Sequence, residues 1–176
     1  MPAALEVDNL STHIRLSRAT VQAVGNVSLG LDTHETVGLV GESGCGKSML
    51  ALSILGLLPN GGHIIEGSIK LGGRELVGLP AAELRRVRGN EVAMIFQDSL
   101  SSLNPTKTIG EQVAEPVRLH RGASKKEALD RALEVLELVG LPRPRERLAD
   151  YPHQLSGGLR QRVMICLLYT SPSPRD

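Results

Sequence analysis

Gly41-Glu42-Ser43-Gly44-Cys45-Gly46-Lys47-Ser48 is the stretch that decides the fold. It fits G-x-x-x-x-G-K-[ST], a glycine-rich loop whose backbone N–H groups form a nest for an anion. Lys47 is expected to reach the β- and γ-phosphates of a nucleotide, and the Ser48 hydroxyl is a candidate Mg²⁺ ligand. The alternative is a plain glycine turn, but a chance match to every fixed position has odds of about one in a hundred. The sequence therefore predicts a nucleoside triphosphate site.

The segments on either side of this loop support the prediction. Residues 34–40 (HETVGLV) have the pattern of a short buried strand that runs into the loop, and residues 47–58 have that of an apolar helix that leaves it. A bound phosphate would then lie at a helix N-terminus, where the helix dipole and the free N–H groups favour an anion.

Composition excludes several classes of protein. The 176 residues carry a net charge of +1 with 22% charged residues, which gives no basic field for nucleic acid. With one Phe, two Tyr and no Trp, the core must be aliphatic and aromatic stacking is a minor binding device. Cys45 and Cys166 give no disulfide framework, which favours a reducing cytosol. The longest apolar stretch, residues 49–58, is too short to span a bilayer, and residues 1–6 lack the basic start of a signal peptide.

The first hundred residues have the patterns of an α/β protein. Apolar residues alternate over 5–7 and 27–31, as in half-buried strands, and residues 64–76 read as a hairpin around Gly72-Gly73. Residues 80–88 predict a short helix that ends at Gly89. The apolar run 92–96 predicts a strand that is covered on both faces.

The following segment changes to helical patterns. Thr108 with Glu111, and Ser124 with Glu127, each fit the capping box that begins a helix. Pro116 should kink the first helix. The inward positions are expected to be Ile109, Val113 and Val117 in the first helix and Leu129, Ala132, Leu133, Leu136 and Val139 in the second, which Gly140 and Pro142 end.

A second motif, LSGGLRQR at residues 155–162, follows these helices. Ser156 is a plausible N-cap, and Gly157 and Gly158 expose backbone N–H groups at a helix start, which makes a second anion site. A capped helix start with flexible glycines is the alternative for this motif alone.

Together these motifs resemble those of the ATP-binding cassette (ABC) ATPases. The loop at 41–48, the Q-loop in Phe96-Gln97-Asp98 and the signature at 155–162 occur in the family's order. The resemblance implies an α/β P-loop NTPase fold with an N-terminal antiparallel β lobe, a RecA-like core and a helical subdomain at about residues 106–160. Residues 96–105 (FQDSLSSLNP) and 151–154 (YPHQ) are similar to the dipeptide, oligopeptide and nickel importer branch.

That resemblance implies an energy-coupling ATPase on the cytoplasmic face of a membrane, bound to permease subunits and served indirectly by an extracytoplasmic solute-binding protein. Two ATP molecules would lie between two such subunits, each held by one subunit's loop and capped by Ser156 and Gly158 of the other. Gln97 would sense Mg²⁺ and the γ-phosphate. The phosphate-loop contacts implied are Gly41, Glu42, Ser43, Gly44, Cys45, Gly46, Lys47 and Ser48.

Three positions depart from the family pattern. Val21 stands where an aromatic residue often stacks on adenine, which weakens the expected base contact. His34 replaces a usual turn glycine and should strain that turn. Leu159 replaces the common Gln of the signature.

The last residues raise a separate expectation. Hydrolysis in the family needs a later strand that ends in Asp-Glu and then a switch histidine. Residues 163–175 contain no acidic residue, and the first acid after Arg162 is the terminal Asp176. Residues 166–176 resemble the translation of a sequencing adapter. We therefore expect residues 1–165 to be a partial ABC ATPase domain without its C-terminal core strands, and 166–176 to be non-native; a genuine Ser/Pro tail is the alternative.

Other functions remain open at this point. Residues 92–98 could be the magnesium strand of a single-domain P-loop protein with Asp98 as the ligand, although such a protein would not need the signature. A soluble ABC ATPase of DNA repair or translation would predict basic patches or paired cysteines. The chain as given could also bind nucleotide without hydrolysing it.

Overall fold

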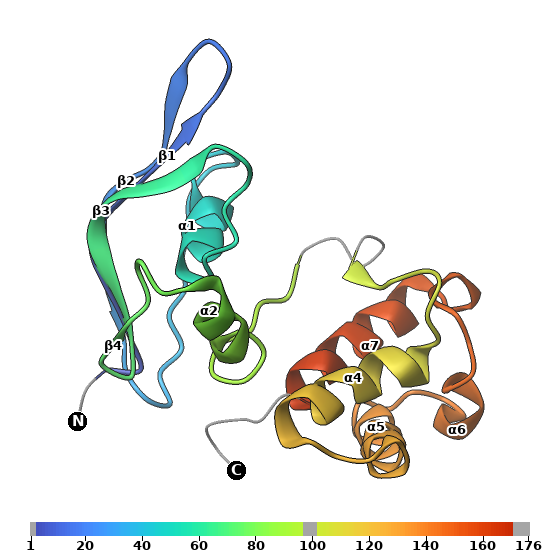
Figure 1. Cartoon of the computed structure of the whole chain (residues 1–176). Coiled ribbons are helices and arrows are strands. Elements are labelled where there is room, and N and C mark those ends of the chain that lie inside the picture. The colour runs from blue at the N-terminus through green and yellow to red at the C-terminus, as the bar shows by residue number, and fades with distance from the viewer. Residues whose placement is uncertain (1–2, 97–101, 171–176) are drawn as a thin grey trace. The chain divides into compact units, whose positions relative to one another are not determined.

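The computed structural model describes residues 3–96 and 102–170, in two compact units that divide between Leu84 and Arg85 (Figure 1). The side chains of residues 168–170 are outside this description.

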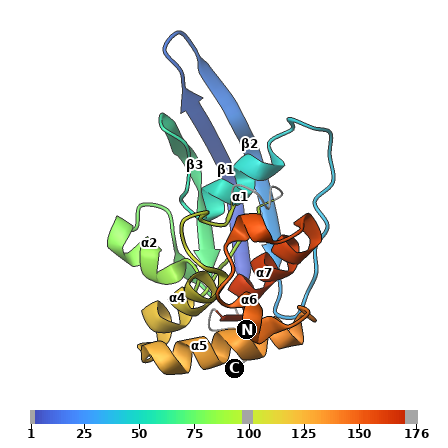
Figure 2. The same ribbon diagram turned by 90° about the vertical axis from the view of Figure 1, so that its right-hand side faces the viewer.

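The first unit is built on an antiparallel sheet in the order β2-β1-β3-β4. The strands are β1 (Leu5–Arg15), β2 (Thr20–Leu31), β3 (Gly62–Leu71) and β4 (Arg74–Glu75). Helix α1 (Lys47–Ile54) contacts β1 and β2, and Figure 2 shows the same lobe from the side. The expected N-terminal antiparallel β lobe is confirmed.

Irregularities in β1 bend the sheet. The pairing of β1 with β2 and β3 shifts register between Val7 or Asp8 and the residues that follow Asn9. Asn9 has a φ of 47°, and Gly67 on β3 has a φ of 99°. A Cβ at Gly67 would lie 2.6 Å from the carbonyl oxygen of Asp8, so only glycine lets β3 approach the bulged strand.

The turn chemistry read from the sequence is confirmed. Gly72 and Gly73 have φ values of 54° and 85° between β3 and β4, which suits the primed turns that hairpins favour. Helix α2 (Ala81–Val87) follows Pro80, and Gly89 ends this segment with a φ of 76°.

Two expected strands are absent from the described residues. Residues 34–40 are not in a strand, and Val40 is 92% exposed. Residues 92–96 contain only an isolated bridge between Val92 and Arg88, and Phe96 is 44% exposed. A strand forms only where a neighbouring strand accepts and donates its backbone hydrogen bonds, and the described sheet holds only β1 to β4, none of which pairs with either segment. These two predictions were wrong.

Helix α1 is also shorter than expected. It ends at Ile54 with Leu55 as its C-cap, because Gly56 adopts a φ of 60° and Pro59 follows. The sequence had predicted a helix as far as residue 58.

The second unit is helical. It contains α4 (Ile109–Arg121), α5 (Lys125–Leu138), α6 (Pro144–Arg147), the 3₁₀ helix η1 (Pro152–Gln154) and α7 (Gly157–Thr170). Helices α4, α5 and α7 contact one another in pairs. None of the helices in the described ranges is both long and apolar enough to cross a membrane.

Both predicted capping boxes are present, with the reciprocal bonds of Thr108 with Glu111 and of Ser124 with Glu127. Helix α4 continues through Pro116. Its expected inward residues are all buried, whereas the buried face of α5 is offset from the prediction. That face consists of Ala128, Ala132, Val135 and Leu136, and Leu129 and Val139 are only partly buried.

Candidate nucleotide-binding site

The glycine-rich loop lies against β2 and leads into α1. Gly44 and Gly46 have φ values of 86° and 95°, in the left-handed region that favours glycine. A Cβ at Gly46 would collide with the carbonyl oxygen of Ala23 on β2. Close approach of the loop to this strand therefore requires the second glycine of the motif.

Lys47 lies at the centre of the loop. Its Nζ atom donates to the carbonyl oxygens of Gly41 and Glu42, both at 2.7 Å, and lies 3.4 Å from Sγ of Cys45. The loop is thus wrapped around a single ammonium group, which places a positive charge where the motif predicts phosphate.

Helix α1 itself, within the described residues, supplies no anion to its own N-terminus. Its N-cap is Gly46, which offers no side-chain hydrogen bond, and no acidic residue lies in the first turn. Ser48 is exposed on that turn. The dipole and the N–H groups of this eight-residue helix are consequently available to an anion.

A pocket of about 380 Å³ lies beside the loop. Its walls come from β2, from the segment before the loop and from the loop itself: Gln22, Ala23, Val24, Gly25, Val27, Leu39, Val40, Cys45, Gly46, Lys47 and Leu50. This volume is in the range of small-ligand sites. Val21 precedes the lining residues on β2, pairs with Ile14 and is 46% exposed.

A buried hydroxyl pair fixes α1 to the sheet. Thr12 Oγ1 on β1 and Ser53 Oγ on α1 lie 2.9 Å apart, and both residues are buried. Ser53 Oγ also donates to the carbonyl oxygen of Met49 at 2.7 Å. Sequence reasoning missed this pair, because a lone Thr in a strand and a lone Ser in a helix carry no pairing signal.

The signature motif lies in the second unit. Ser156, Gly157 and Gly158 are exposed at the start of α7, and Leu155 before them is 2% exposed. A Cβ built on either glycine would meet no atom within 4 Å. The motif therefore offers an open helix start, anchored by one buried leucine.

Arg162, in the same motif, has a structural role that the sequence did not indicate. Its Nη1 atom donates to the carbonyl oxygens of Val139 and Gly140, both at 2.9 Å, at the C-terminal end of α5. A cation at a helix C-terminus satisfies its free carbonyl groups and complements its dipole. Arg162 thereby fixes α7, and the signature that begins it, against α5.

Two predicted residues fall outside the description. Gln97 and Asp98 lie among the residues that the structure does not describe, so the proposed Q-loop contact and the alternative metal ligand stay predictions. Across residues 3–96 and 102–170, no three His, Cys, Asp or Glu side chains are grouped to hold a metal ion.

The loop, the lysine whose ammonium group it holds and the helix that follows define the class of P-loop nucleotide-binding proteins. The family model of the ABC transporter matches residues 24–174, so the chain belongs to the ABC transporter family. A solved dimeric structure of the ATP-binding cassette MJ0796, in a post-hydrolysis state bound to ADP and Pi, matches 96% of this chain and 70% of that one. Its TM-score is 0.83 at 30% identity, which confirms the fold class.

Curated relatives add a narrower similarity. The chain is 48% identical over 168 residues to the oligopeptide transport ATP-binding protein AppD of Bacillus subtilis, covering 95% of this chain and 51% of AppD. It is 47% identical over 164 residues to the probable peptide ABC transporter ATP-binding protein y4tR of Sinorhizobium fredii, covering 93% of this chain and 49% of y4tR. The chain spans about half the length of these relatives.

Proposed function

We propose that this chain carries the nucleotide-binding part of an ATPase subunit that drives an ABC importer. The observation that carries the proposal is the position of Lys47, held at the centre of the glycine-rich loop at the N-terminus of α1. ATP is the nucleotide proposed, with Lys47 on its β- and γ-phosphates and Ser48 and Gln97 on Mg²⁺. Val21 is proposed beside the base.

Peptides are the proposed cargo, in preference to nickel. Support comes from the relatives, since AppD and y4tR are both named for oligopeptide or peptide transport. The cargo itself would be selected by a solute-binding protein and by permease subunits, and this chain would supply the energy at the cytoplasmic face of the membrane.

A second ATP-binding subunit completes the proposed site. Ser156 and Gly158 would cap an ATP molecule held by the partner's loop. The open start of α7 supports this role, because no side chain of the described residues covers it from within the helical unit. The dimeric state of the MJ0796 cassettes is in agreement with such an arrangement.

A chimera tests the proposal. Residues 1–165 would replace the matching half of AppD in a Bacillus subtilis strain that lacks AppD, and growth on an oligopeptide as the required amino-acid source would be measured. We expect growth, and we expect Lys47→Ala and Ser156→Arg each to abolish it. Chimeric protein that hydrolyses ATP but does not restore uptake would overturn the importer assignment, and one that restores growth despite Lys47→Ala would overturn the site.

A further inference from the structure

The turn between α4 and α5 carries a cluster of basic residues. Residues 116–126 (PVRLHRGASKK) contain Arg118, Arg121, Lys125 and Lys126 and no acidic residue. All four of these cations are exposed. The chain as a whole has a net charge of only +1, so this cluster is a local concentration of charge.

Helix stability does not account for the two lysines. Arg118 and Arg121 lie in the last turn of α4, where cations complement the helix dipole. Lys125 and Lys126 are instead the first two residues of α5, where the dipole disfavours cations. The positions of these lysines are explained more readily by an external anion than by folding.

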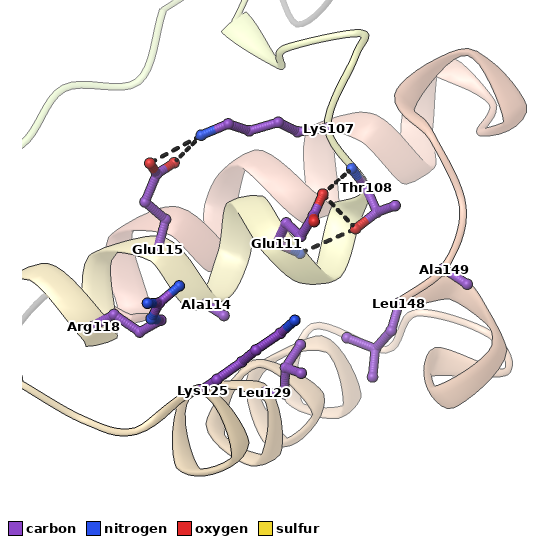
Figure 3. A pocket seen from close by; sticks show the side chains of 10 residues that line it. All are labelled: Lys107, Thr108, Glu111, Ala114, Glu115, Arg118, Lys125, Leu129, Leu148 and Ala149. Carbon is purple, nitrogen blue, oxygen red and sulfur yellow. Dashed lines mark hydrogen bonds and ion pairs between the residues drawn. The ribbon is translucent and has the colours of Figure 1, made fainter.

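Two of the cations face a single pocket. Arg118 from α4 and Lys125 from α5 both line a pocket of about 730 Å³, and Figure 3 shows Lys125 extended between the two helices. Of the pocket's acids, Glu115 is paired with Lys107 at 3.0 Å and Glu111 accepts the capping bonds of Thr108. Within the described residues, the side chain of Arg118 has neither a hydrogen bond nor an ion pair, and Lys125 acts on Glu111 only through its charge.

An apolar side chain projects from the middle of the basic cluster. Leu119 is 73% exposed, and it lines a smaller hollow of about 270 Å³ together with Glu115, Arg118, Gly122 and Ala123. Glu115 is already paired with Lys107. An exposed leucine in the same segment as four cations matches the interface of a bilayer, where acyl chains accept the leucine and anionic headgroups accept the cations.

We propose that the α4–α5 turn, residues 118–126, is a docking surface for anionic phospholipid. The lipid phosphate lies between Arg118 and Lys125, Arg121 and Lys126 meet neighbouring headgroups, and Leu119 enters the upper acyl region. The surface lies in the helical unit and needs no nucleotide. It therefore adds a direct lipid contact to the membrane location proposed above and can fail or hold independently of the ATP site.

Vesicle flotation tests this proposal, since it separates lipid-bound protein from any aggregate. The 176-residue chain should float with phosphatidylcholine vesicles in which about one lipid in three is the anionic phosphatidylglycerol. It should not float with vesicles of phosphatidylcholine alone. Arg118→Gln/Lys125→Gln should lower the partition coefficient about thirtyfold, because each basic residue near the membrane surface contributes a factor of slightly more than about five. High salt should weaken binding of the unmodified chain.

Matched variants separate this surface from general charge. Arg85→Gln/Arg86→Gln removes two exposed cations from α2 and should leave flotation unchanged. Lys47→Ala should also float normally, so that failure of the nucleotide site is distinguishable. Loss of binding in these controls equal to that in the Arg118/Lys125 variant would overturn the proposal, as would complete displacement by millimolar inorganic phosphate, which would indicate a simple anion site.

Leucine insertion has its own readout because the chain has no tryptophan. Leu119→Trp should show a blue-shifted emission and quenching by brominated acyl chains when anionic vesicles are added. Leu138→Trp is the control, since Leu138 is 70% exposed on α5 but lies outside the basic turn. Equal quenching at both positions, or none at Leu119→Trp, would contradict insertion. Binding of an acidic peptide in place of vesicles would identify a protein partner and overturn the lipid assignment.

Discussion

The hydroxyl groups of Thr12 and Ser53 lie 2.9 Å apart in the core of the first unit, and they join β1 to the helix that begins in the phosphate loop. Ser53 has one proton, which it donates to the carbonyl oxygen of Met49, so Thr12 must be the donor between the two hydroxyls. The orientation of α1 on the sheet, and with it the loop, depends on this pair.

Substitutions at this pair should show coupling. Ser53→Ala leaves the Thr12 hydroxyl buried without an acceptor and should cost about 1–3 kcal/mol in the free energy of unfolding. Thr12→Val keeps the shape of the side chain and leaves Ser53 bonded to Met49, so it should cost less, about 1 kcal/mol. The loss in the free energy of unfolding of the double variant should be smaller than the sum of the losses of the two single variants. Additive losses in urea unfolding would show that the hydroxyls do not interact.

The sequence predicted local features more accurately than distant ones. Both capping boxes and the Gly72-Gly73 hairpin are encoded within four residues, and the structure has all three. The expected strands at 34–40 and 92–96 depend on neighbours elsewhere, and hydrophobicity alone could not show that the described sheet lacks those neighbours. The Thr12–Ser53 pair joins residues 41 positions apart, which no local pattern reveals.

The capping boxes should make the helical unit sensitive to acid. Hydrogen bonds from the backbone and side chain of Thr108 lower the pKa of Glu111, and those from Ser124 lower the pKa of Glu127. A carboxyl group whose pKa falls on folding stabilises the native state above its unfolded pKa, here 4.5, and this contribution is lost as the pH falls through the lower folded value. Glu111→Gln/Glu127→Gln should flatten the pH dependence of stability below pH 5, measured by circular dichroism. An unchanged slope would show that the boxes do not form in solution.

The two thiols should differ sharply in reactivity. Cys45 is exposed in the phosphate loop, whereas burial raises the pKa of Cys166 to about 12. Because the thiolate is the nucleophile, a maleimide at pH 7.5 should label Cys45 alone in the folded chain and both thiols in denaturant. Mg-ATP should protect Cys45, and the adduct should block ATP binding. Cys45→Ala supplies the unlabelled control, and equal rates with and without Mg-ATP would place the nucleotide elsewhere.

His34 has a strained backbone, as the sequence comparison with the family had suggested. Its φ is 68°, in the left-handed region that costs a residue with a Cβ about 1–2 kcal/mol. His34→Gly should raise the free energy of unfolding by about 0.5–1 kcal/mol, since glycine removes the strain but adds freedom to the unfolded chain. His34→Ala keeps the Cβ and should give no gain. A gain with alanine equal to that with glycine would assign the effect to the imidazole.

Lys47 provides the most direct test of the nucleotide site. Its ammonium group bonds the carbonyl oxygens of Gly41 and Glu42 and is the charge that would face the phosphates. Charge-assisted hydrogen bonds contribute roughly 1.5–3 kcal/mol, so Lys47→Ala should weaken ATP binding by about ten- to a hundredfold in calorimetry. Lys70→Ala, which removes an exposed lysine from β3, is the matched control and should bind as the unmodified chain does.

Lys47→Ala also tests the loop itself, because alanine cannot hold Gly41 and Glu42 together. Amide hydrogen exchange should rise at residues 41–46 and stay unchanged in β1 and β3. Unchanged ATP affinity together with faster exchange in the loop would mean that Lys47 only shapes the loop, and the phosphate site would then have to be sought outside it.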